Sequence, residues 1–137
     1  MTTGTPGSEM PTRLVRIAVV DSAPMVRDGM NVILAEIGGN ELVLSVGKAT
    51  ELLYALRAGL MVDVVFLRLG GGNVAINGLV NALGKQFPVV RTMVTFDFPI
   101  EAHEAHADVV GATWIISSAE VDRAQLRTLV EEIRSLL

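Results

Sequence analysis

A short apolar run near the middle of the chain constrains its fold more than any other feature. Residues 64–67 read Val-Val-Phe-Leu; Asp63 precedes them, and Arg68, Leu69 and three glycines follow. A run this short, rich in β-branched and aromatic residues, is typical of a strand that is buried on both faces. Open sheets of parallel strands place their functional groups at the carboxyl ends of the strands. We therefore expect Arg68 to lie at the functional edge of such a sheet.

Composition narrows the class of protein. The 137 residues suit one domain with a full core, and 50% of them are hydrophobic, as in a compact globular chain. No apolar run approaches the ~20 residues that cross a membrane. The net charge of −4 does not favour a nucleic acid or an anionic membrane as a direct partner of this domain. The chain has no cysteine, which excludes disulfides and thiolate metal sites and fits a cytoplasmic protein.

The beginning of the chain differs from the rest. Its first twelve residues are rich in threonine, glycine, proline and serine, and they lack the apolar core of a signal peptide. We interpret residues 1–12 as a flexible N-terminal tail and residues 13–137 as a single domain.

Apolar periodicity predicts strands and helices that alternate along this domain. The predicted strands cover residues 15–20, 42–46, 62–67, 89–95 and 113–116. Helices are predicted at residues 24–37, 50–59, 76–87 and 99–108 and, last, around residues 126–136, with Ser22, Thr50 and Ser117 as candidate capping residues. Alternating β and α elements imply a parallel sheet with helices on both faces. The expected fold class is α/β, a flavodoxin-like doubly wound sheet of five parallel strands in the order 2-1-3-4-5.

With its elements placed, the chain resembles the receiver domain of bacterial response regulators over nearly all of residues 15–136. Four pieces carry the resemblance: residues 19–30 (Val-Val-Asp-Ser-Ala-Pro-Met-Val-Arg-Asp-Gly-Met), residues 63–69, Thr95 at the end of the fourth strand, and Gly111-Ala112 before the fifth. The first piece looks most like receivers that precede a helix-turn-helix DNA-binding domain. The resemblance implies a role in two-component signal transduction and transcription regulation rather than an enzymatic activity.

The resemblance also implies a phosphorylation site, from which this sequence departs. Family members carry a phosphorylated aspartate after the third strand, an acidic pair after the first strand that holds Mg²⁺, and a lysine after the fifth. Here Asp21 keeps the first acid, and Arg68 stands at the phosphoacceptor position. Ser22 replaces the second acid, and Ser117 or Ser118 stands at the position of the lysine.

Of the two switch positions of the family, one is kept here and one differs. Thr95 keeps the hydroxyl that follows the phosphoryl group in the family, whereas Ile115 replaces the aromatic switch residue.

Mg²⁺ binds oxygen ligands, and one carboxylate beside a guanidinium is a poor cation site. Arginine has neither an acceptor atom nor an accessible nucleophilic form. We therefore predict an atypical receiver that works without phosphorylation, without metal and without a cofactor.

Three interpretations of Arg68 remain open. It could pair with Asp21 and lock one conformation, or extend into solvent beside a decayed site. It could also bind an anion together with the backbone amides of Gly70, Gly71 and Gly72. The last interpretation would make the chain a ligand-sensing domain that binds a small molecule or an anion near Arg68, and we keep it as an alternative hypothesis.

The remaining candidate residues concern metals and partners. His103 and His106 share one face of a predicted helix, a spacing that can bind a transition metal weakly, although a solvated face is the simpler interpretation. Trp114, Arg123 and Arg127 are candidate interface residues, because the fourth helix, fifth strand and fifth helix form a common dimer surface in the family.

These observations predict a homodimer or a complex with a partner protein. A C-terminal DNA-binding domain could follow Leu137, outside this chain. A small flavodoxin-like enzyme or cofactor carrier is a third hypothesis, but no constellation of nucleophile and base in the sequence supports it.

Overall fold

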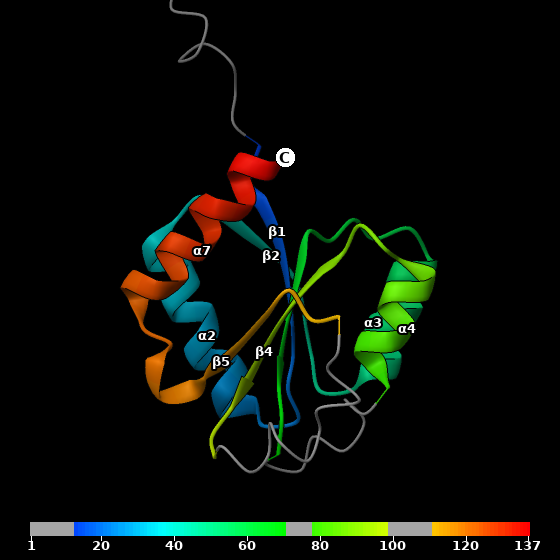
Figure 1. Ribbon diagram of the computed structural model, residues 1–137, viewed down its shortest axis with the longest axis horizontal. Coiled ribbons are helices and arrows are strands. Elements are labelled where there is room, and N and C mark those ends of the chain that lie inside the picture. Colours follow the sequence, from blue (N-terminus) through cyan, green and yellow to red (C-terminus); the bar gives the residue numbers. More distant parts are fainter. Residues whose placement is uncertain (1–12, 71–77, 99–110) are drawn as a thin grey trace, which may run out of the picture.

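The structure is a computed structural model that describes residues 13–70, 78–98 and 111–137. Its centre is a sheet of five parallel strands in the order β2-β1-β3-β4-β5 (Figure 1). The predicted fold class and strand order are therefore confirmed. The strands are β1 (Val15–Val20), β2 (Asn40–Val46), β3 (Val64–Arg68), β4 (Arg91–Phe96) and β5 (Trp114–Ser117).

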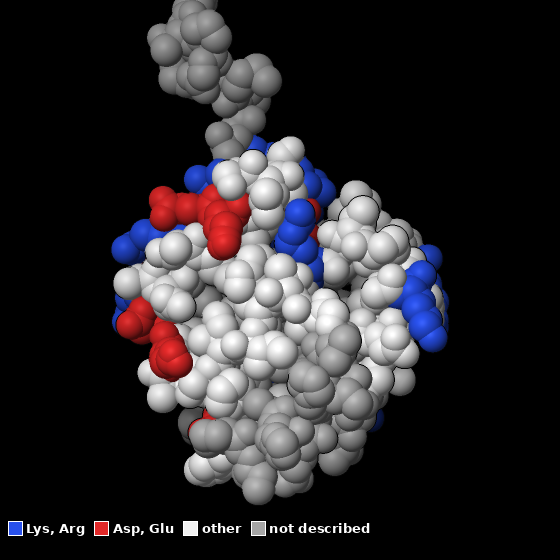
Figure 2. Space-filling view, viewed as in Figure 1, with Lys and Arg blue, Asp and Glu red and all other residues white. Residues whose placement is uncertain are grey.

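Helices cover both faces of this sheet, as predicted. One face carries α2 (Pro24–Ile37) and α7 (Arg123–Leu136), and the other carries α3 (Ala49–Arg57) and α4 (Leu79–Gln86) (Figure 1). Figure 2, drawn from the same side, shows acidic side chains gathered over α7 and a largely uncharged surface over β5. No helix among the described residues is long and apolar enough to span a membrane. The helix predicted at residues 99–108 lies outside the described residues.

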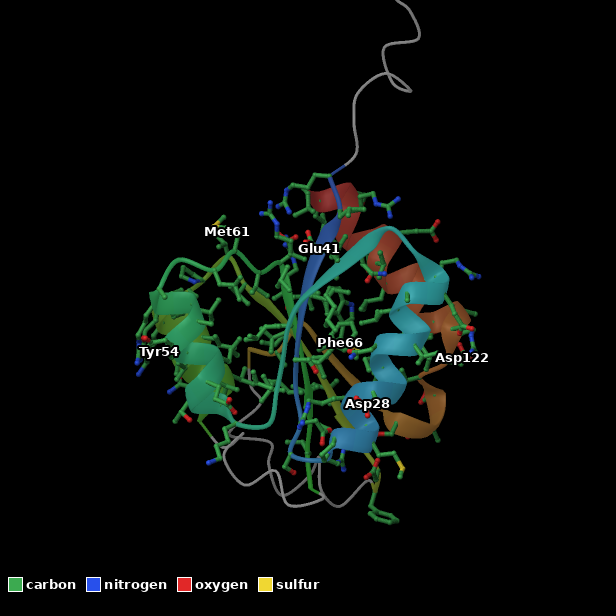
Figure 3. The ribbon with its side chains drawn as sticks, turned by 180° about the vertical axis from the view of Figure 1, so that it is seen from behind. Asp28, Glu41, Tyr54, Met61, Phe66 and Asp122 are labelled. Carbon is green, nitrogen blue, oxygen red and sulfur yellow. The ribbon has the colours of Figure 1, made fainter. Side chains whose placement is uncertain are left out.

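The core consists of two apolar clusters, one on each face of the sheet. Successive side chains of a strand point to opposite faces, so Val64 and Phe66 of β3 join the cluster under α2 and α7, while Val65 and Leu67 join the one under α3 and α4. Figure 3 shows Phe66 in the interior, whereas Tyr54 projects from the outer side of α3. All four residues of β3 before Arg68 are buried, which confirms a strand buried on both faces.

The register of the sheet brings three polar residues to the same level. Val20 of β1 is paired with Leu67 of β3, and Arg68 is paired with Thr95 of β4. Asp21, which follows Val20, therefore meets Arg68 at the carboxyl edge of the sheet. The first and third strands are also where the strand order reverses, the usual place for a site in this fold.

The three predicted helix caps were wrong. Ser22 lies one residue too early, because α2 begins at Pro24 with Ala23 as its N-cap. Thr50 lies inside α3, whose N-cap is Lys48.

Ser117 ends β5 and is the N-cap residue of a 3-10 helix, η2 (Ser118–Glu120), but its side chain makes no capping hydrogen bond there, and η2 separates it from α7. Asp122 caps α7 instead, and its carboxylate accepts a hydrogen bond from the backbone N–H of Gln125 at 2.8 Å.

Candidate functional site

Arg68 and Asp21 form a two-pronged ion pair at the carboxyl edge of the sheet. Nε of Arg68 donates to Oδ2 of Asp21 at 2.7 Å, and Nη2 donates to Oδ1 at 2.9 Å. The fork of the guanidinium matches both carboxylate oxygens, which is the geometry that makes such pairs specific. The side chain of Asp21 is 2% exposed and that of Arg68 is 14% exposed, so water screens the pair weakly.

The backbone around Asp21 holds its carboxylate in place. Its N–H donates to the carbonyl of Val46 at 3.0 Å, which extends the pairing of β1 with β2. The N–H of Ala23 donates to Oδ1 of Asp21 at 2.9 Å, and Nη1 of Arg27 donates to the carbonyl oxygen of Asp21. The carboxylate thus accepts three hydrogen bonds from described residues, two of them from Arg68.

Arg68 also forms an ion pair with a second acid, Asp97, which follows the neighbouring strand β4. Its Nη1 donates to Oδ2 of Asp97 at 3.2 Å, just after β4. The hydrogen bonds to Asp21 raise the pKa of the Arg68 guanidinium; burial opposes that rise, and the negative charges of Asp21 and Asp97 add to it. Arg68 is therefore a permanent cation between two carboxylates.

Thr95 lies beside Arg68 but is engaged within the sheet. Its hydroxyl donates to the carbonyl oxygen of Leu67 at 3.4 Å, and its own carbonyl accepts from the N–H of Leu69 at 2.8 Å. Thr95 is 8% exposed. The structure thus brings Asp21, Arg68 and Thr95 together, in agreement with their predicted positions at one edge.

The residues present do not fit a divalent cation. Both carboxylate oxygens of Asp21 face the guanidinium of Arg68, whose charge would repel a metal ion. Within the described part of the chain, no three acidic or histidine side chains are grouped where they could hold a metal. The cavity beneath the pair measures about 40 Å³, which is room for roughly one water molecule.

The other predicted site residues differ in their exposure. Ser22 is exposed, and Ser117 and Ser118 are half-buried at the end of β5. Ile115 is 44% exposed. Trp114 is half-buried on the opposite face of β5, where it packs against the cluster under α2 and α7.

The predicted interface residues on α7 differ from one another. Arg123 pairs with Glu36 of α2 within the chain, and both side chains are about half exposed (57% and 49%). Arg127 is exposed. His103, His106, Gly71 and Gly72 lie outside the described residues.

Sequence reasoning missed two acids of the structure. Asp97 directly follows a strand at the functional edge, and this position in the sequence indicates that its side chain can lie near Arg68. Asp63 pairs with Arg13 at the opposite edge, through two hydrogen bonds of 2.7 and 2.8 Å from Nη1 and Nη2. Asp63 was visible only as the boundary of a strand, since Arg13 lies fifty positions earlier.

Comparisons with known proteins match this geometry at the level of the fold. No protein-family model and no curated protein matches the chain. Among solved structures, a CheY-like response regulator receiver domain protein from Methanospirillum hungatei JF-1 is 18% identical, with a TM-score of 0.73 over 90% of this chain and 96% of that one. A DNA-binding response regulator of the LuxR family from Staphylococcus aureus is 12% identical, with a TM-score of 0.73 over 88% of this chain and 99% of that one.

A third match is RcsB from Salmonella enterica serovar Typhimurium, bound to the rprA promoter. It is 17% identical, with a TM-score of 0.69 over 85% of this chain and 66% of that one. The chain has the receiver-domain fold of response regulators. Receiver domains are signalling modules and not, in general, enzymes.

Proposed function

We propose that this chain is a receiver module that signals without phosphorylation. One observation carries the proposal: the ion pair of Arg68 with Asp21 occupies the place where the resemblance puts Mg²⁺ and a phosphorylated aspartate. A guanidinium cannot accept a phosphoryl group, and its charge substitutes for that of the metal. The module neither catalyses a reaction nor needs a cofactor.

The ion pair would fix one conformation of the switch region. It ties the end of β1 to the end of β3, and the contact of Arg68 with Asp97 adds the end of β4. Three strand ends are then held by one side chain. In a receiver that is phosphorylated, these ends adjust to the phosphoryl group; here they are held together permanently.

The output of such a module is contact with another protein. The matched LuxR-family protein is a DNA-binding response regulator, and RcsB has been solved as dimers bound to DNA. We propose by analogy that residues 13–137 form a dimerisation or partner-binding domain of a cytoplasmic transcription regulator. Residues 1–12 would be a tail, and DNA binding would belong to a domain outside this chain.

The alternative of a ligand near Arg68 has less support. The guanidinium is already engaged by two carboxylates, which leaves little positive charge for an anion. The cavity at this place, about 40 Å³, is far smaller than the roughly 150 Å³ that holds even a benzene molecule in another protein. Among the described residues, nothing at this edge favours a bound metabolite.

Incubation with acetyl phosphate and Mg²⁺ tests the proposal. Intact-protein mass spectrometry should show no phosphate on this chain under conditions that phosphorylate a receiver domain with an aspartate at the phosphoacceptor position, run in parallel. The variant Asp21→Asn serves as a matched control, because Asp21 is the acid that this chain keeps from the family's acidic pair. A phosphate on the wild type that is absent from Asp21→Asn would overturn the proposal.

A further inference from the structure

A groove lies between α7 and the two strands at the far edge of the sheet. Its volume is about 250 Å³. Met93 of β4 and Trp114 and Ile116 of β5 line it from the sheet, and Leu129 lines it from α7.

The walls of the groove are apolar and include one aromatic ring. Met93 and Leu129 are buried, whereas Trp114 and Ile116 are half-buried. An indole face and a thioether favour contact with a flat, polarisable ring. A dry cavity of about 150 Å³ holds benzene in another protein, so 250 Å³ suits a ligand of one or two rings.

Polar side chains of α7 also line the groove, and one of them, Glu132, is negatively charged. Gln125 and Glu132 are exposed, line the groove, and lie two turns apart on the same face of α7. Glu132 forms no ion pair with any residue in the described ranges, in contrast to Glu36, which pairs with Arg123. A carboxylate at the mouth of an apolar groove favours a ligand that carries a positive charge.

The groove is held open by the way α7 is anchored. Leu126, Val130 and Ile133 direct the helix toward the cluster that it shares with α2 and β1. At its start, Asp122 caps the helix, and Arg123 pairs with Glu36 of α2. These contacts fix α7 over α2 and β1, so that the helix cannot settle onto β5 without breaking them. The space is therefore preformed, as ligand sites usually are.

We propose that this groove binds a small aromatic amine, with its ring against Trp114 and its ammonium group at Glu132. The proposal does not depend on the ion pair of Arg68 with Asp21 or on the phosphorylation state of the chain. A ligand here would lie against β5 and α7, elements that the resemblance associates with dimer contacts, and it would act as an input separate from the carboxyl edge.

Intrinsic fluorescence provides the experiment, because Trp114 is the only tryptophan of the chain. The probe is 2-phenylethylamine, whose ring does not absorb where indole is excited; phenylacetate and 2-phenylethanol are the anionic and neutral counterparts. We expect a saturable change of the Trp114 emission with the amine, and binding about fivefold tighter than that of the neutral probe, the factor that 1 kcal/mol represents. The amine should also raise the melting temperature.

Two variants test the assigned contacts. Glu132→Gln should abolish the preference for the amine, whereas Glu131→Gln, the same change at an exposed neighbour that does not line the groove, should keep it. Ile116→Phe should fill the groove and remove the saturable change, with circular dichroism as the check of folding. The proposal is overturned if the wild type shows no saturable change, if the three probes bind equally, or if Glu132→Gln keeps the preference.

Discussion

Two arginine–carboxylate pairs of nearly the same geometry lie at opposite edges of the sheet. At the carboxyl edge, Arg68 donates hydrogen bonds of 2.7 and 2.9 Å to the carboxylate of Asp21. At the amino edge, Arg13 donates hydrogen bonds of 2.7 and 2.8 Å to that of Asp63. Their surroundings differ. The side chain of Arg68 is 14% exposed and that of Arg13 is 44% exposed, and the carboxylates are 2% and 11% exposed.

The difference in exposure separates two roles. An exposed arginine can turn to water when its partner is lost, so the amino-edge pair resembles a surface salt bridge of small worth. Arg68 is largely removed from water, so the loss of Asp21 would leave its charge balanced less well, by the longer contact with Asp97. The pair of Arg13 with Asp63 thus adds a surface contact at the amino edge of the sheet. In our proposal, the pair of Arg68 with Asp21 holds the switch region in one conformation at the carboxyl edge.

The largest effect is expected for Asp21→Ala. Removal of the carboxylate leaves Arg68 in a poorly solvated place with the 3.2 Å contact to Asp97 as its remaining ion pair among the described residues, which should lower the free energy of unfolding by about 3 kcal/mol. Urea denaturation measures this free energy of unfolding. A change below about 0.5 kcal/mol would mean that water solvates Arg68 well enough to replace the pair.

A smaller effect is expected for Asp63→Asn. The carboxylate of Asp63 accepts from Arg13 and from the backbone N–H of Arg16 at 2.7 Å. An amide keeps the shape but loses the charge, so we expect a loss of about 1–2 kcal/mol at neutral pH. A loss of unfolding free energy equal to that of Asp21→Ala would contradict the difference that we infer between the two ion pairs.

The pH dependence of the same variant sharpens this prediction. Burial acts to raise the pKa of Asp63, but the hydrogen bonds from Arg13 and the Arg16 backbone, together with the positive charges, outweigh it and lower the pKa. A lowered carboxyl pKa contributes stability that is fully present above the unfolded pKa of about 3.9 and is lost as pH falls through the folded pKa. The stability difference between wild type and Asp63→Asn should therefore shrink below about pH 4. A constant difference would contradict the assignment.

Arginine-to-lysine changes compare the two cations directly. Lysine keeps the charge but cannot form two parallel hydrogen bonds with one carboxylate. Arg68→Lys should cost about 1 kcal/mol, whereas Arg13→Lys should cost less, because that side chain is largely in water. Melting temperatures at low and high salt measure both, and salt should weaken only the amino-edge pair appreciably.

Glu36→Gln gives the smallest expected effect and serves as the reference. The pair of Glu36 with Arg123 joins two helices at the surface, and both side chains are about half exposed. Its loss should change the free energy of unfolding by no more than about 0.5 kcal/mol. A larger loss would show that the anchoring of α7 depends on this pair.

Much of this architecture was readable from the sequence. The buried run before Arg68 and the alternation of elements were enough for the fold class and strand order, because period-2 and period-3.6 patterns report burial directly. The meeting of Asp21 with Arg68 was predictable too, since both follow strands that the topology makes neighbours. The helix caps were not, because serine, threonine and aspartate compete for such positions and a local motif does not decide among them.

Other features depend on spacing in three dimensions. The pair of Arg13 with Asp63 requires the register of β1 against β3, which periodicity does not specify. The groove beside Trp114 requires the tilt of α7 over α2, and no sequence pattern encodes the volume that remains beside β5. Sequence identified Trp114 as a candidate contact residue but could not tell which face of the sheet it occupies.

The most direct test of the central claim is a double-mutant cycle between Asp21 and Arg68. The free energy of unfolding is measured for wild type, Asp21→Ala, Arg68→Ala and the double variant, with the same cycle on Arg13 and Asp63 as the comparison. We predict a coupling energy of about 2 kcal/mol or more at the carboxyl edge, well above that at the amino edge. A coupling energy at the carboxyl edge that is no larger than the one at the amino edge would contradict the lock.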